Sequence, residues 1–141
     1  MGVPVRVLVV DDQEPFRVAA ADVVSATEPF VLVGTEATGE GCLAAVPRLR
    51  PDLVLLDVTL PGIDGLEVTR RLSAAPGAPA VVLVSSYDED AFADQIAASG
   101  AVAYISKSVF GSEGLAAAWA LVTGITARTS DVPPGSPLTT T

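Results

Sequence analysis

The polar residues of this chain that could do chemistry stand where short apolar runs end. Three aspartates, one serine and one lysine share this placement: Asp11 and Asp12 after residues 5–10, Asp57 after 53–56, Ser85 after 81–84, and Lys107 just past 102–105. Each apolar run is typical of a buried β-strand. In an open α/β sheet, ligands bind beyond the carboxyl ends of the strands. We therefore expect three carboxylates, one hydroxyl and one ammonium to converge on a single rim.

This set of side chains predicts phosphoryl chemistry that uses a metal ion. Carboxylates held close together repel one another, which raises a pKa or demands a cation, and oxygen ligands alone favour Mg²⁺. Asp57 is placed to act as a nucleophile and form an aspartyl phosphate, with the metal ion and Lys107 neutralising the transferring oxygens. Neither a GxxxxGK nor a GxGxxG loop occurs. The phosphoryl donor must therefore come from another molecule.

Each of these residues also has an ordinary structural interpretation. The Asp11–Asp12 pair and Ser85 could cap helices, Asp57 could form a turn, and a lone lysine is usually a solvated charge. Lys107 is, however, the only lysine, the other seven basic residues being arginines. A compact ammonium suits a point contact with a phosphoryl oxygen. Coincidence at four strand ends explains the pattern less well than a shared site does.

Strands and helices are expected to alternate along the chain. The apolar runs predict strands over 5–10, 30–33, 53–56, 81–84 and 102–105, and helical spacing predicts helices over 13–27, 40–49, 66–74, 88–99 and 115–122. This alternation is typical of an α/β fold with a parallel sheet covered on both faces. Residues 125–141 are mostly Ser, Thr, Pro and Gly, so we expect one domain over 1–124 followed by a flexible tail or linker over 125–141.

Composition excludes several classes of function. The chain has 141 residues, half of them hydrophobic, which is enough for a folded core, and a net charge of −9, which disfavours direct binding to nucleic acid. Histidine is absent and Cys42 is the only cysteine. An intrachain disulfide, a Cys/His zinc site and histidine-dependent catalysis are therefore excluded. No apolar segment is long enough to span a membrane, so we expect a cytoplasmic location.

Four segments resemble the CheY-like receiver domain of bacterial two-component response regulators, and most nearly its LuxR/NarL branch. They are VRVLVVDD, RPDLVLLDVTLPGIDGLEV, VVLVSSYD and GAVAYISK. The resemblance implies a doubly wound, flavodoxin-like (βα)5 fold with strand order 2-1-3-4-5. It makes Asp57 the phosphoacceptor and assigns Mg²⁺ to Asp12, Asp57 and the main-chain carbonyl of Thr59, with Asp11 acting through water. By the same resemblance Ser85 and Lys107 contact phosphoryl oxygens, and Tyr104 is a switch aromatic that turns inward when the serine moves.

The resemblance also implies how such a protein signals. A sensor histidine kinase or phosphotransfer protein would supply the phosphoryl group, and the surface formed by 88–99, 102–105 and 115–122 would change and could pair with a second copy. The chain would be a phosphoacceptor rather than an enzyme acting on other molecules, either a stand-alone regulator or the regulatory part of a transcriptional regulator. Many receivers have proline after the lysine, where Ser108 stands here, so we expect the Lys107–Ser108 peptide to be trans.

Two alternatives remain open. A degenerate receiver would act as an interaction module without being phosphorylated, although such modules usually lack one of the acids or the lysine. A phosphatase of the haloacid dehalogenase type also uses a nucleophilic aspartate and Mg²⁺. Those enzymes have an acid two residues beyond the nucleophile, where this chain has Thr59.

Overall fold

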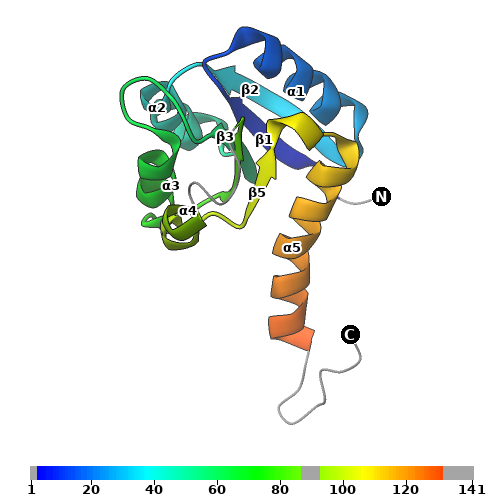
Figure 1. Cartoon of the computed structure of the whole chain (residues 1–141). Helices are drawn as coiled ribbons and strands as arrows, with labels where there is room; N and C mark the ends of the chain where they lie inside the picture. The colour runs from blue at the N-terminus through cyan, green and yellow to red at the C-terminus, as the bar shows by residue number, and fades with distance from the viewer. Residues whose placement is uncertain (1–2, 87–92, 132–141) are drawn as a thin grey trace.

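A single parallel β-sheet forms the centre of the computed structural model, which describes residues 3–86 and 93–131 and the side chains as far as residue 124 (Figure 1). The strand order is β2-β1-β3-β4-β5. The strands are β1 (Val5–Val10), β2 (Phe30–Glu36), β3 (Leu53–Asp57), β4 (Ala80–Ser85) and β5 (Ala103–Ser106). The expected α/β fold and the strand order 2-1-3-4-5 are confirmed.

Helices cover both faces of this sheet (Figure 1). They are α1 (Glu14–Ala26), α2 (Gly39–Leu49), α3 (Gly65–Ser73), α4 (Ala93–Ser99) and α5 (Ser112–Asp131). Successive residues of β1 serve opposite faces, as the two-residue period of a strand requires. Val7 and Val9 pack in the cluster that includes residues of α1 and α5, whereas Leu8 and Val10 pack in the cluster that includes residues of α2 and α3. Burial on both faces explains why the central strands β3 and β4 are apolar up to their last residues.

The loop that follows β3 is held in place by its neighbours. Asp64 caps α3 by accepting a hydrogen bond from the Glu67 N–H at 2.9 Å. At Gly65 a β-carbon would collide with the carbonyl oxygen of Asp57, so only glycine allows α3 to begin this close to the strand end. The Gly65 N–H donates to the Val58 carbonyl oxygen at 2.8 Å. These contacts fix the position of Asp57 relative to the helix that follows it.

Several boundaries differ from those expected. β2 continues to Glu36 because Thr35 and Glu36 pair with Val9 and Val10 of β1. α5 extends from Ser112 to Asp131 and is therefore longer at both ends than the expected range 115–122. Its C-terminal extension is possible because no proline interrupts the chain before Pro133. Residues 88–92 of the expected fourth helix lie outside the described residues, as do residues 132–141 of the expected tail. No helix in the described part of the chain is long and apolar enough to cross a membrane.

Candidate functional site

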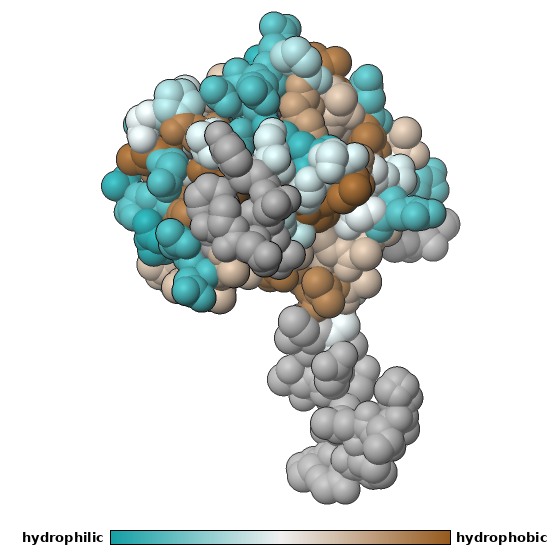
Figure 2. Space-filling model, in the orientation of Figure 1, coloured by the Kyte–Doolittle hydropathy of each residue, from teal (hydrophilic) through white to brown (hydrophobic). Residues whose placement is uncertain are grey.

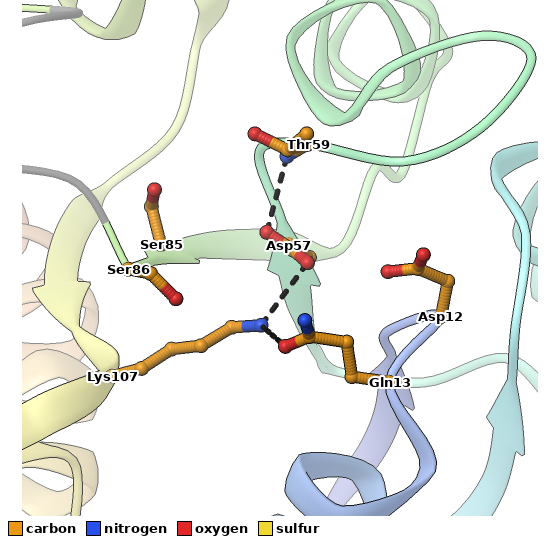
Figure 3. A pocket seen from close by; sticks show the side chains of 7 residues that line it. All are labelled: Asp12, Gln13, Asp57, Thr59, Ser85, Ser86 and Lys107. Carbon is orange, nitrogen blue, oxygen red and sulfur yellow. Dashed lines mark hydrogen bonds and ion pairs between the residues drawn. The ribbon is translucent and has the colours of Figure 1, made fainter.

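The strand ends bring the expected polar side chains around one small pocket (Figure 3). Asp57 and Ser85 are the last residues of β3 and β4, Asp12 lies two residues past β1, and Lys107 directly follows β5. The pocket has a volume of about 140 Å³ and is lined by Asp12, Gln13, Asp57, Thr59, Ser85, Ser86 and Lys107. The convergence expected from the sequence is therefore present, with Asp11 buried behind the pocket wall.

Three carboxylates lie close together at this edge. One oxygen from each of Asp11, Asp12 and Asp57 lies within 4.8 Å of the other two. Asp11 and Asp57 are buried, whereas Asp12 is exposed. Burial raises the pKa of Asp57, and the neighbouring Asp11 charge adds to the rise against the opposing effects of the Thr59 N–H and of Lys107. The surroundings of Asp57 therefore disfavour the ionised form of its carboxyl group.

Lys107 supplies the counter-charge for the two buried carboxylates. Its Nζ lies 2.7 Å from Asp11 Oδ2 and 3.1 Å from Asp57 Oδ2, and its side chain is 10% exposed. The pKa of Lys107 is raised, although burial acts to lower it, because both carboxylates favour the charged ammonium. The ammonium also lies 4.8 Å from the centre of the Phe16 ring, within the range of a cation–π contact.

The remaining expected residues occupy different positions relative to the pocket. The Thr59 N–H donates to Asp57 Oδ1 at 3.1 Å, which holds the carboxylate facing the loop after β3. Ser85 is buried and Ser86 is exposed, and Figure 3 shows the Ser86 side chain pointing toward Lys107 and that of Ser85 pointing away from it. Tyr104 does not line this pocket: it lies on β5, half-buried against the α2–α3 side of the core.

The backbone after the lysine is regular. Lys107–Val109 form a short 3-10 helix that begins directly after β5. Among the described residues the cis peptide is Glu28–Pro29, so the Lys107–Ser108 bond is trans, as expected from the absence of proline.

Two contacts to Lys107 were not expected from the sequence. Gln13 Oε1 accepts a hydrogen bond from Lys107 Nζ at 3.2 Å, and Phe16 underlies the ammonium. The Phe16 ring also packs on the Phe110 ring, with the two ring centres 5.8 Å apart. Gln13 is part of no recognised sequence motif. Its position directly after the two strand-end aspartates is the one feature of the sequence that could have identified it as a residue of the site.

The donor set fits a hard divalent cation. Asp12 and Asp57 bring carboxylate oxygens to the pocket. Within the described part of the chain, the buried Asp11 Oδ2 accepts no well-directed hydrogen bond and is compensated by the Lys107 ammonium at 2.7 Å. Buried carboxylate oxygens without hydrogen-bond donors are stabilised by a cation, and Mg²⁺ prefers oxygen ligands. The arrangement combines a buried carboxylate that lines the pocket, a group of carboxylate oxygens that suits a cation, and an ammonium, a combination that fits the chemistry of phosphoryl transfer.

Comparison with known proteins adds an independent line of evidence. The family model for the response regulator receiver domain matches residues 7–119. The chain is 39% identical over 103 residues to response regulator GacA of Pseudomonas aeruginosa, covering 73% of this chain and 48% of GacA. The chain thus spans about half the length of this curated relative.

Solved structures give the same result. A LuxR-family two-component response regulator from Aurantimonas superposes with a TM-score of 0.78 at 27% identity, covering 86% of this chain and 87% of that one. The signal receiver domain of the putative response regulator NarL from Mycobacterium tuberculosis gives a TM-score of 0.73 at 26% identity, covering 93% of this chain and all of that one.

Proposed function

Because the chain belongs to the response regulator receiver domain family of two-component systems, we propose that Asp57 is its phosphoacceptor. The observation that carries this proposal is the ion pair of the only lysine with Asp57 at the floor of the pocket. The carboxylate is buried and held by a backbone N–H, yet one side of it opens into a hollow large enough for a phosphoryl group.

The proposed reaction transfers a phosphoryl group and nothing else. An Asp57 carboxylate oxygen attacks phosphorus, a P–O bond forms, and the bond from phosphorus to the donor breaks with its electron pair leaving on the donor atom. The donor is a phosphohistidine of a sensor kinase or phosphotransfer protein. Hydrolysis returns Asp57 to its unphosphorylated form. Water attacks phosphorus, the P–O bond to Asp57 breaks with its electron pair remaining on the carboxylate, and inorganic phosphate leaves with the oxygen and protons of the water. The chain is thus a signalling phosphoacceptor rather than an enzyme acting on a separate substrate.

Mg²⁺ is the proposed cofactor of this transfer. Asp12, Asp57 and the main-chain carbonyl of Thr59 would hold the ion, with Asp11 acting through water. When bound, it neutralises charge on the transferring phosphoryl oxygens. Lys107 holds the Asp57 carboxylate from the opposite side, and Ser85 offers a hydroxyl to a phosphoryl oxygen.

Output is proposed to run through the surface of α4, β5 and α5. Ser85 and Lys107 would move toward the phosphoryl group, which carries about −1.5 to −2 charge, and Tyr104 would turn inward behind them. An apolar hollow of about 310 Å³ between β5 and α5 supports this surface as a docking site for a second copy. It is lined by Tyr104 and Leu121 among others, and Figure 2 shows apolar colour where α5 leaves the body.

The domain organisation remains a proposal as well. Residues 1–124 would form the receiver domain and 125–141 a linker or tail, whose first residues lie within α5 as it runs to Asp131. The acidic charge of −9 supports a cytoplasmic regulator in which any DNA binding belongs to another domain or partner. A degenerate receiver that is never phosphorylated is the second candidate.

Intact-protein mass spectrometry after incubation with acetyl phosphate tests the proposal. We expect one phosphoryl adduct that requires Mg²⁺, is removed by hydroxylamine, and is lost in Asp57→Asn and in EDTA. Asp22→Asn, which changes an exposed carboxylate of α1, is the matched control and should keep the adduct. Absence of an adduct in the unchanged protein, together with no response to beryllofluoride, would leave the degenerate receiver as the function.

A further inference from the structure

Gln13 lines the phosphoacceptor pocket. It belongs neither to the proposed metal ligands nor to the proposed switch residues. We propose that Gln13 is a positioning residue for phosphoryl transfer: its amide oxygen holds Lys107, and its amide nitrogen donates a hydrogen bond to the phosphoryl oxygens. The inference rests on the proposed function of Asp57 and adds a residue that tunes how readily the acyl phosphate forms.

The position of Gln13 in the fold releases its side chain for this task. Gln13 is the N-cap residue of α1, yet its side chain makes no capping hydrogen bond. Its backbone is fixed on both sides, because its N–H donates to Asp11 Oδ1 at 2.8 Å and its carbonyl oxygen accepts from the Arg17 N–H at 3.0 Å. Side chains at this position usually satisfy the helix N–H groups. This one reaches across to Lys107 instead.

The chemistry of the two groups sets the orientation of the amide. A lysine ammonium has three N–H donors and no acceptor, so the Gln13 oxygen must face Lys107 and the NH₂ group must face elsewhere. Figure 3 shows the Gln13 nitrogen on the side of the amide that faces Asp57, among the side chains that line the pocket. Lys107 thereby fixes a neutral hydrogen-bond donor at the place where negatively charged oxygens would arrive.

The partners of Lys107 explain why this arrangement suits transfer. Among the described residues, Asp11, Asp57 and Gln13 are the polar partners of the ammonium, and the Phe16 ring lies beneath it. Asp11 and Asp57 are charged and buried, so releasing either would leave a carboxylate uncompensated. Gln13 is neutral and exposed. Its amide oxygen can therefore hold the ammonium beside an incoming phosphoryl oxygen without bringing a further charge, while its NH₂ group contacts the same phosphoryl group.

Beryllofluoride binding and acetyl phosphate kinetics test this role in Gln13→Met, which keeps the length of the side chain and removes both hydrogen-bonding groups. A hydrogen bond to a charged group corresponds to a change of about tenfold or more in an equilibrium constant. We expect beryllofluoride, titrated by calorimetry in Mg²⁺, to bind Gln13→Met about tenfold more weakly. We expect the rate constant for phosphorylation by acetyl phosphate to fall by a similar factor. Gln13→Glu keeps the acceptor oxygen but adds a negative charge, so it should lower both the beryllofluoride affinity and the rate constant for phosphorylation further than Gln13→Met does.

Two controls separate positioning from a structural effect. The Mg²⁺ affinity of Gln13→Met should match that of the unchanged protein, because the amide is not proposed to hold the ion. Its urea midpoint should change little, because Gln13 is exposed. Asp22→Asn, which changes an exposed side chain of α1 that does not line the pocket, should leave beryllofluoride affinity unaltered. Equal or tighter beryllofluoride binding by Gln13→Met overturns the inference while Asp57 remains the phosphoacceptor. Failure of the unchanged protein to bind beryllofluoride and to be phosphorylated overturns the proposed function itself.

Discussion

Lys107 holds two buried carboxylates in place, so its removal tests the electrostatic description of the site. Nζ lies 2.7 Å from Asp11 Oδ2 and 3.1 Å from Asp57 Oδ2. Unit charges 4 Å apart interact by about 4 kcal/mol at an effective dielectric constant of about 20, and both separations are shorter than that. The attraction is partly offset by desolvation of the three groups. Removing one partner of a buried pair costs about 3–5 kcal/mol, since the other partner stays buried and uncompensated.

We expect Lys107→Met to lower the free energy of unfolding by about 3 kcal/mol at neutral pH in EDTA. With a urea dependence of about 1–3 kcal/mol per molar, the unfolding midpoint should fall by about 1–3 M. Fluorescence of the single tryptophan, Trp119, reports the transition, because its ring packs edge-on against Phe30 at 6.5 Å in the core. Mg²⁺ should restore more stability to the variant than to the unchanged protein, since the cation replaces the missing counter-charge.

The control is Arg48→Met, which removes one positive charge from an exposed position in the last turn of α2. That arginine interacts favourably with the helix dipole, an effect of less than about 1 kcal/mol. A Lys107→Met midpoint that coincides with that of Arg48→Met would refute the claim that Lys107 compensates buried charge.

Three further predictions follow from burial and backbone geometry. Because the pKa of Asp57 is raised in the folded state, folding binds its proton more tightly. The free energy of unfolding should therefore fall as the pH rises from 3.8, the ordinary pKa of an aspartate, through the raised pKa of Asp57. Urea titrations at several pH values measure this dependence, which Asp57→Asn should reduce. The same pH dependence in Asp57→Asn and in the unchanged protein would contradict the prediction. Burial, with a smaller effect of Glu36, raises the pKa of the Cys42 thiol to about 12. Native protein should therefore react with a thiol reagent at pH 8 only as fast as it unfolds, and faster labelling would show that the thiol is accessible. Gly65→Ala forces a β-carbon against the Asp57 carbonyl and should destabilise by about 2 kcal/mol or more and slow phosphorylation. Gly111→Ala, with open space around it, should be neutral in both assays.

The positions of the carboxylates and of Lys107 could be predicted from the sequence because each follows an apolar run. A run such as 53–56 must be buried, so the first charged residue after it marks where the strand reaches the edge of the sheet. The order of the strands did not come from this pattern: it came from the resemblance to receiver domains. Periodicity alone indicates which segments are strands, but it does not determine which strands lie next to each other in the sheet.

The features that could not be predicted depend on where side chains turn. Gln13 caps α1 by position, and nothing in its residue type indicates that its amide reaches Lys107. Phe16 has the helical spacing of a core residue, and its contact with the ammonium follows from the meeting of α1 with the chain after β5. α5 continues past the expected end at residue 122 and includes Gly124, because the change in composition after this residue does not by itself end a helix. A glycine inside a helix costs only about 1 kcal/mol relative to alanine, so it does not end a helix unaided.

The charges of the site explain why metal binding and phosphoryl transfer should be coupled. Asp11, Asp12 and Asp57 with Lys107 carry a net charge of −2 when all are ionised, and the pKa of Asp57 is already raised by its surroundings. A phosphoryl donor brings further negative charge to a pocket of about 140 Å³, where two of those carboxylates are buried. Lys107 alone does not balance this charge, because its ammonium already compensates part of the charge of Asp11 and Asp57. A divalent cation would bring the four side chains to neutrality, so phosphoryl transfer to Asp57 should depend on one.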